Sequence, residues 1–368
     1  MTQSHPRRRL SGKISRRTLL VEGLAAAGIG TAGAVLRDYL HQRSRKARVF
    51  IAKAASYNAD LVSLIADGLR SLSIGPGEIR GKRILLKPNF VETVPGTVHI
   101  CTRPEVVLAA VEVFRKLGAA AVLVGEGSGH CRDTARVLEE AGMAETLIEH
   151  KTPFVDLNND DLIIRPNAGR VRVAGAPPSN RGHELAPAQA GDARDTWLAT
   201  LTLPATVDQV DWIVSMPKMK THHWLGVTLS MKNLFGLMPG IVYGWPKNVF
   251  HWAGLEQSVL DINATVKPRL AIVDGIVGME GDGPIMGTPK PAGVLVMGRD
   301  LAAVDATAAR IMGIDPFKVT YLKSANGALG TILADNIVQR GENLAAVRTD
   351  FQLLDSIPAH QGLRLAHA

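Results

Sequence analysis

Residues 83–129 read "RILLKPNFVETVPGTVHICTRPEVVLAAVEVFRKLGAAAVLVGEGSG" and place a helical pattern between two short apolar runs. The runs "RILLK" and "AVLVGE" have the length and apolar character of buried strands. Between them, "TRPEVVLAAVEVFRKLGA" has apolar residues at helical spacing, a proline near its first turn and a glycine at its end. This order predicts a strand, a helix and a second strand joined by short connections.

The same alternation extends along the chain in both directions. Further strands are expected at 47–54, 269–278 and 292–300, and a strand that runs into a loop is expected at 210–220. Helices are expected at 58–72, 133–143, 227–238, 254–266 and 301–313. Alternation of this kind predicts an α/β fold, a mostly parallel sheet with helices on both faces. We expect one large domain over 49–340, with an irregular Gly-, Pro- and Ala-rich excursion at 167–197 that contains a small hairpin, and a C-terminal extension at 341–368.

The positive charge of the chain is concentrated at its amino terminus. Residues 1–48 contain eleven Lys or Arg and two acidic residues, whereas the whole chain has a net charge of +8. The remainder is therefore close to neutral, which argues against a general nucleic-acid-binding surface. Residues 1–34 are interpreted as a targeting signal or anchor and residues 35–48 as a basic linker.

The tract "SRRTLL" (15–20) resembles a twin-arginine export signal, and Ala32-Gly33-Ala34 offers a small-residue cleavage site. The apolar run that follows the arginines is interrupted by Glu22 and rich in small residues, so it is a poor transmembrane helix. We expect the export machinery as a partner and a location in the periplasm or on the outer face of the cytoplasmic membrane. If the segment is not cleaved, it would be the only membrane attachment.

A concentrated positive charge occurs in "MPKMKTHHWLGVTLSMKNLFGLMPG" (216–240), within a stretch from Asp211 to Glu256 that has no acidic residue between its ends. Lys218 and Lys220 are two residues apart, so in extended chain they point the same way. Ammonium groups this close repel each other unless an anion lies between them. The alternative is that surface lysines extend from a core strand. His222 and His223 are adjacent and point apart, so we expect one of them at the site.

Five expected strand ends carry polar groups, and the carboxyl ends of parallel strands are where ligands bind in open α/β sheets. These ends are Lys87-Pro88-Asn89, Gly125-Glu126-Gly127-Ser128-Gly129, the Lys218 and Lys220 pair, Asp274-Gly275, and Arg299-Asp300. If the strands are parallel neighbours, the five groups converge on one edge of the sheet. The lysines would then face acids and an anionic ligand held by other parts of the chain.

The segment "DGIVGMEGDGPIMGTPK" (274–290) is the acidic counterpart of the lysine-rich stretch. Its glycines allow the backbone to approach a ligand closely, and its carboxylates are the hard oxygen ligands that a divalent ion such as Mg²⁺ prefers. The alternative is a turn whose acidic side chains accept backbone N–H groups. In the last expected helix, Asp300 is placed as an N-cap. Asp305 lies at the edge of the apolar stripe and requires a partner, such as a lysine or a metal ion.

The two cysteines, Cys101 and Cys131, are preceded closely by His99 and His130. A disulfide, a site for a soft metal, and two unrelated thiols are all compatible with this spacing. Because the cysteines form no C-x-x-C-x-x-C cluster, we expect no iron–sulfur cluster.

Six motifs, "ILLKPNFV", "TRPEVV", "VGEGSG", "MPKMKTH…VTLSMKNLFG", "DGIVGMEGDGP" and "GRDLAAVDATAARIMG", occur in this order between Ile84 and Gly313. Together they resemble the family called domain of unknown function 362. Some members of that family carry appended ferredoxin-like cysteine clusters, which this chain lacks. The resemblance implies a shared site and assigns no reaction to it.

We therefore expect an exported enzyme that acts on a small anionic molecule with a divalent metal ion. The alternatives are a non-catalytic ligand- or cofactor-binding protein of the cell envelope, and a redox accessory protein. The catalytic candidates are Lys220, Lys232, Glu126 and Asp305; the substrate-binding candidates are Lys87, Asn89, Ser128, Lys218, His222 and Asn233; and the metal-binding candidates are Asp274, Glu280 and Asp282.

Overall fold

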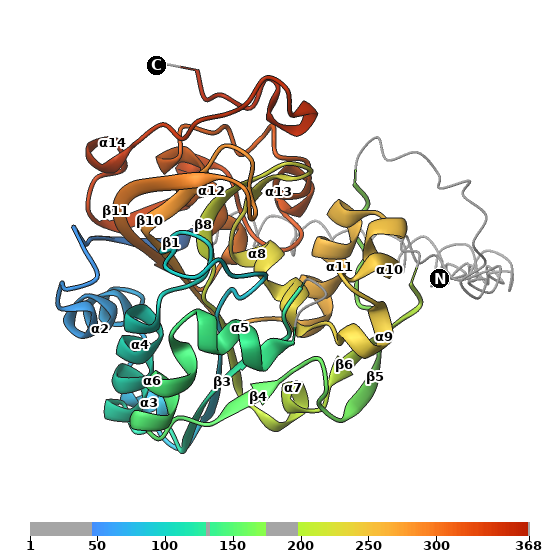
Figure 1. Ribbon diagram of the computed structural model, residues 1–368. Helices are drawn as coiled ribbons and strands as arrows, with labels where there is room; N and C mark the ends of the chain where they lie inside the picture. The colour runs from blue at the N-terminus through green and yellow to red at the C-terminus, as the bar shows by residue number, and fades with distance from the viewer. Residues whose placement is uncertain (1–45, 130–132, 174–197, 367–368) are drawn as a thin grey trace, which may run out of the picture. The chain divides into compact units, whose positions relative to one another are not determined.

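The central element of the fold is a ten-stranded sheet (Figure 1). The computed structural model describes residues 46–129, 133–173 and 198–366. Within them the sheet has the order β12-β1-β11-β10-β7-β2-β3-β4, with β8 attached to β10 and β9 attached to β8. The strands are β1 (Ala47–Lys53), β2 (Arg83–Lys87), β3 (Ala121–Glu126), β4 (Phe154–Asp156), β7 (Trp212–Ser215), β8 (Lys218–His222), β9 (Gly226–Thr228), β10 (Leu270–Glu280), β11 (Thr288–Gly298) and β12 (Ile337–Gly341).

Helices cover both faces of this sheet, which confirms the predicted α/β fold (Figure 1). Alternate residues of β2 show the two layers: Ile84 and Leu86 pack in one apolar cluster and Leu85 in the other, and all three are fully buried. The first cluster includes α2 (Leu61–Ser71), α3 (Pro76–Ile79), α4 (Pro104–Lys116) and α6 (Met143–Glu149). The second includes α8 (Ser230–Asn233), α11 (Leu255–Val266), α12 (Leu301–Ile311) and α13 (Thr320–Ala325).

The order of the parallel strands contains a switch point between β2 and β7. The chain moves from β2 to β3 and β4 on one side, and then returns to β7 on the other side of β2, parallel to it. The residues Lys87 and Ser215 at the two carboxyl ends are direct neighbours in register. Such a reversal leaves a crevice beyond the strand ends, where open α/β sheets bind ligands.

One of the five expected strand ends lies at the opposite edge of the sheet. Strand β11 runs antiparallel to β10, with Gly298 opposite Ala271, so Arg299 and Asp300 are remote from the carboxyl ends of the parallel strands. The short Gly- and Pro-containing connection 281–287 makes this reversal possible. Arg299 pairs with Glu78 instead, and Asp300 caps α12 by accepting from Ala303 N.

The lysine-rich stretch differs from its expected secondary structure. Residues 218–222 form strand β8, where a loop was expected after β7. The expected helix at 227–238 is divided into β9, α8 and the 3-10 helix η1 (Leu234–Leu237). Gly226, with φ of +78°, turns the chain between β8 and β9, a conformation that favours glycine.

The remaining elements are a small second sheet, the C-terminal segment and several short helices. The strands β5 (Leu162–Pro166) and β6 (Thr200–Pro204) form a two-stranded antiparallel sheet that flanks the expected excursion, of which residues 174–197 lie outside the described part. Phe351 and Leu363, from the expected C-terminal extension, are buried in the same core as α12. The short helices are α5 (Thr134–Glu140), α7 (Thr206–Gln209), α9 (Gly240–Tyr243), α10 (Asn248–Trp252), η2 (Ala334–Asn336), α14 (Leu344–Val347) and η3 (Pro358–His360).

Candidate functional site

A cavity of about 490 Å³ opens at the carboxyl ends of β2 and β3. We call it the lysine cavity. Its volume is in the range of small-molecule sites. Its charged and polar lining residues are Lys87, Asn89, Glu92, Glu126, His222, His223, Thr228, Lys232, Asn233, Lys247, His251 and Asp282, and its apolar lining includes Phe90, Val91, Trp224, Phe235, Pro246, Ile285 and Met286.

A buried ion pair forms part of the cavity wall. Lys87 Nζ lies 2.6 Å from Glu126 Oε2, and the two side chains are 1% and 2% exposed. The same Glu126 oxygen accepts from Phe90 N at 3.1 Å, and its other oxygen accepts from Gly127 N at 2.9 Å. Burial lowers the pKa of Lys87 and raises the pKa of Glu126, and each partner's charge opposes the other's shift. Desolvation therefore opposes the charged forms of both groups, and their mutual attraction supports those forms.

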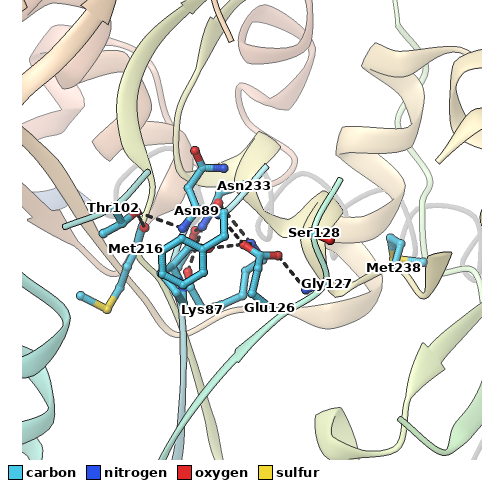
Figure 2. Close-up of polar contacts among 12 residues, drawn as sticks. Lys87, Asn89, Thr102, Glu126, Gly127, Ser128, Met216, Asn233 and Met238 are labelled. Atoms are coloured by element: carbon cyan, nitrogen blue, oxygen red, sulfur yellow. Dashed lines mark hydrogen bonds and ion pairs between the residues drawn. The ribbon is translucent and has the colours of Figure 1, made fainter. Parts of the chain in front are cut away.

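Asn233 connects this pair to the neighbouring strand β7, and its contacts with Lys87 are drawn as dashed lines in Figure 2. Its Oδ1 accepts from Lys87 Nζ at 3.2 Å, and its Nδ2 donates to Lys87 O and to Ser215 Oγ. Asn233 therefore ties the ends of β2 and β7 together at the switch point.

The close approach of η1 to the ion pair depends on Gly236. A Cβ at this position would overlap Glu126 Oε1 and would lie 2.5 Å from Lys87 Nζ. Gly236 also accepts a backbone hydrogen bond from Gly127 N at 3.0 Å. Only a residue without a side chain lets η1 seal the pair from this side.

Lys232 and Lys247 add two further cations to the cavity. Lys232 Nζ lies 4.0 Å from the centroid of the Phe235 ring. Burial, and then the charge of Lys87, lower the pKa of Lys232 to about 8. Burial lowers the pKa of Lys247 to about 7. Lys247 has a φ of +67°, which non-glycine residues rarely adopt, so its backbone is held in a strained conformation.

Two buried oxygen atoms in the cavity wall have no hydrogen-bond partner within the described part of the chain. They are Asn89 Oδ1 and Thr228 Oγ1, and both residues are 3% exposed. A buried polar atom without a partner costs free energy, so such atoms are rare in folded proteins. These two oxygen atoms make this part of the cavity wall polar.

Aromatic residues surround another part of the cavity. The rings of His223 and Trp224 are 4.5 Å apart between centroids, and Trp224 and His251 are 5.2 Å apart. His222 Nδ1 accepts from Trp224 N at 3.0 Å, and burial places the pKa of His222 well below its usual value. His222 is therefore a neutral imidazole with its proton on Nε2. Contrary to the expectation for adjacent residues, both His222 and His223 line the cavity.

The other two lysines of the stretch lie beside the cavity without lining it. Lys218 Nζ pairs with Asp274 Oδ2 at 2.5 Å, with both side chains fully buried, and it also donates to Tyr57 OH. Lys220 is also fully buried, and its Nζ donates to Pro284 O at 3.1 Å. Burial lowers the pKa of Lys220 to about 7.

The three metal-binding candidates each have a different partner. Asp274 pairs with Lys218, Glu280 pairs with Lys290 at 3.3 Å, and Asp282 pairs with His223 at 3.4 Å. Within residues 46–129, 133–173 and 198–366, no three His, Cys, Asp or Glu side chains are grouped so that they could hold a metal ion.

Asp305 and Ser128 have structural partners. Asp305 is fully buried and accepts from Ser230 N at 2.7 Å and Met231 N at 3.0 Å, so it caps α8, the helix that carries Lys232. Burial raises its pKa to about 7. Ser128 lies against Thr134, with 3.3 Å between the two hydroxyl oxygens.

Several cavity residues were not among the candidates from sequence. Lys247 is the clearest omission, because it belongs to the same acid-free stretch as the other lysines. Its Nζ donates to Asn158 Oδ1 and to Met238 O, and the latter distance is 2.6 Å. Cys101 is a buried free thiol, and Cys131 lies outside the described residues.

The fold and site define an α/β protein with a lysine-containing cavity at the switch point of a mostly parallel sheet. The family described as domain of unknown function (DUF362) matches residues 84–177 and 181–310. The chain therefore belongs to this family.

One relative is the thylakoid-associated protein sll1697 of Synechocystis sp., which is 29% identical over 244 residues. The matched region is 64% of this chain and 64% of the relative's length. The helices in the described part of this chain are too short or too polar to span a membrane.

Proposed function

We propose that the chain is an enzyme that binds a small anionic organic molecule in the lysine cavity and transfers a proton through the Lys87–Glu126 pair. The observation that carries this proposal is the excess of lysines among the buried charged residues of the wall. Two lysines, Lys87 and Lys247, are buried there with a single carboxylate, Glu126. The third lysine, Lys232, and the other two acids, Glu92 and Asp282, are partly exposed.

The shape and chemistry of the lining support a ligand with one anionic end and an apolar body. Phe90, Phe235, Ile285 and Met286 provide apolar surface, and Lys87, Lys232 and Lys247 provide amines. Charge-assisted hydrogen bonds to a carboxylate or phosphate are stronger than neutral ones, particularly away from water. No step is assigned to a divalent ion, because the three carboxylates expected to hold one have separate partners.

Calorimetric titration with benzoate and with benzamide tests the proposal, because the two molecules share a shape and differ in charge. Benzoate should bind at least about tenfold more tightly than benzamide. Lys247→Met should weaken benzoate binding, whereas Lys318→Met, at an exposed position, should leave it unchanged. Equal binding of the two molecules, or no binding of benzoate, glyoxylate or phosphate, contradicts the proposal. Binding of anions with no product from any of them would favour a non-catalytic binding protein.

We also propose that residues 1–34 direct twin-arginine export. The support is the "SRRTLL" tract and the thylakoid association of the Synechocystis relative. Replacing Arg16 and Arg17 together by lysine should retain the protein in the cytoplasmic fraction of its host. The matched control replaces Arg7 and Arg8 by lysine and should be exported like the parent. Export of both variants at the parental rate contradicts this assignment.

A further inference from the structure

The position of Lys232 distinguishes it from the other lysines at the site. It is the third residue of α8, whose first turn is fixed by the capping carboxylate of Asp305. Lys87 Nζ and Lys247 Nζ each donate to oxygen acceptors. Among the described residues, by contrast, the structure gives Lys232 Nζ a contact with the Phe235 ring and no hydrogen bond or ion pair. Its lone pair is thus available once the proton is lost.

The surroundings of Lys232 favour loss of that proton near neutral pH. An exposed lysine has a pKa of about 10.4, whereas burial and the charge of Lys87 lower the pKa of Lys232 to about 8. The neutral fraction at pH 7 is therefore on the order of a hundredfold larger than for a surface lysine. A desolvated lysine beside a second cation is a known arrangement for an amine that attacks carbonyl groups.

We propose that Lys232 forms an imine with the carbonyl carbon of an anionic aldehyde or 2-oxo acid bound in the lysine cavity. This inference rests on the proposed function and specifies its substrate class. The Lys232 nitrogen forms a bond to the carbonyl carbon, and the carbon–oxygen bond then breaks. The oxygen leaves as water with the two amine hydrogens, so no oxidant or other reactant is needed. The Lys247 side chain holds the anionic end of the molecule, because all three hydrogens of Lys87 Nζ are already donated within the protein.

Lys247 is the competing nucleophile, and its geometry makes it the weaker candidate. Its Nζ donates to Asn158 Oδ1 and to Met238 O, and an attack on a carbonyl would require it to leave both. Lys247 is therefore better placed to bind the anion than to attack the carbonyl carbon.

The test uses the full chain, glyoxylate as an anionic aldehyde, propanal as its uncharged counterpart, and cyanoborohydride to reduce any imine to a stable amine. Peptide mapping by mass spectrometry should find one glyoxylate adduct, on Lys232, whose formation saturates with glyoxylate concentration. Propanal should label this position far less. Adduct formation should increase as pH rises toward 8, because Lys232 loses its proton in this range.

Three variants complete the experiment. Lys232→Arg keeps the positive charge and should bind benzoate but form no adduct, and Lys232→Met should also form none. Lys318→Met should be labelled like the parent. Circular dichroism checks that each variant is folded. Labelling of Lys247 in place of Lys232, labelling spread over surface lysines, or equal labelling by propanal overturns the inference. Benzoate binding without any adduct overturns the inference and leaves the proposed function standing, whereas absence of both overturns both.

Discussion

The buried Lys87–Glu126 pair should show strong energetic coupling, which a double-mutant cycle can measure. The cycle compares Lys87→Met, Glu126→Gln and the double variant with the parent. Both side chains are almost completely buried and their charged atoms are 2.6 Å apart. Removing one partner leaves the other charge, or its neutral form, in a site built for an ion pair.

The expected magnitude follows from the partners that remain in each variant. Without Lys87, the Glu126 carboxylate still accepts from Phe90 N and Gly127 N, and without Glu126, the Lys87 ammonium still donates to Pro88 O and Asn233 Oδ1. We therefore expect the lower end of the range for a broken buried pair, about 3 kcal/mol for each single variant. The double variant should cost about 2 kcal/mol less than the sum of the single variants, because no unpaired charge remains.

Urea unfolding followed by tryptophan fluorescence measures the free energy of unfolding of the four proteins. The slope against urea must stay constant for the comparison to hold. Single variants that each cost less than about 1 kcal/mol, or additive effects in the double variant, would refute the reasoning, because surface ion pairs behave in that way.

Three further perturbations give sharp expectations. Gly236→Ala should destabilise the fold and abolish benzoate binding, because its methyl group would overlap the Glu126 carboxylate. The methyl group of the control Gly77→Ala meets no atom within 4 Å, so this variant should change neither the free energy of unfolding nor benzoate binding. Burial raises the pKa of Asp305 from 3.8 to about 7, so the folded protein binds this proton more tightly than the unfolded chain, and the parent loses stability as pH rises between these values. Asp305→Asn should therefore gain up to roughly 4 kcal/mol of stability relative to the parent as pH rises over this range. A difference that stays constant with pH would show that the carboxyl group does not titrate there. Burial lowers the pKa of Lys220 to about 7, so the unfolded chain holds this proton to higher pH and the parent gains stability as pH rises above 7. Lys220→Met should therefore be more stable than the parent below pH 7. A variant that is less stable than the parent at every pH would contradict the burial argument.

Local patterns were sufficient to predict the sheet and the strand ends at its centre. The apolar run before Lys87 and the glycines around Glu126 identify two adjacent strands and the points where they end. The direction of β11 was not predicted, because a run of buried apolar residues does not indicate whether a strand is parallel or antiparallel to its neighbours. The connection at 281–287, short and containing Gly and Pro, carries the only local signal of an antiparallel turn.

The role of Asp305 shows why the rest of the site could not be read from sequence. Its position at the edge of an apolar stripe correctly required a partner, but that partner is the start of α8, about 75 residues earlier in the chain. Long-range capping leaves no periodic signal. Lys247 was accessible to sequence reasoning through the acid-free stretch, whereas Asn158, which accepts from it, lies in a turn with no distinguishing pattern.

A crystal structure of the protein with 4-iodobenzoate tests the central claim most directly, because the anomalous signal of iodine locates the apolar end of the ligand. The account predicts the carboxylate within hydrogen-bonding distance of the amines of Lys232 and Lys247, and the iodine against Phe235 or Met286. Iodobenzoate bound only outside the lysine cavity, or bound inside it with its carboxylate away from both amines, would contradict the account.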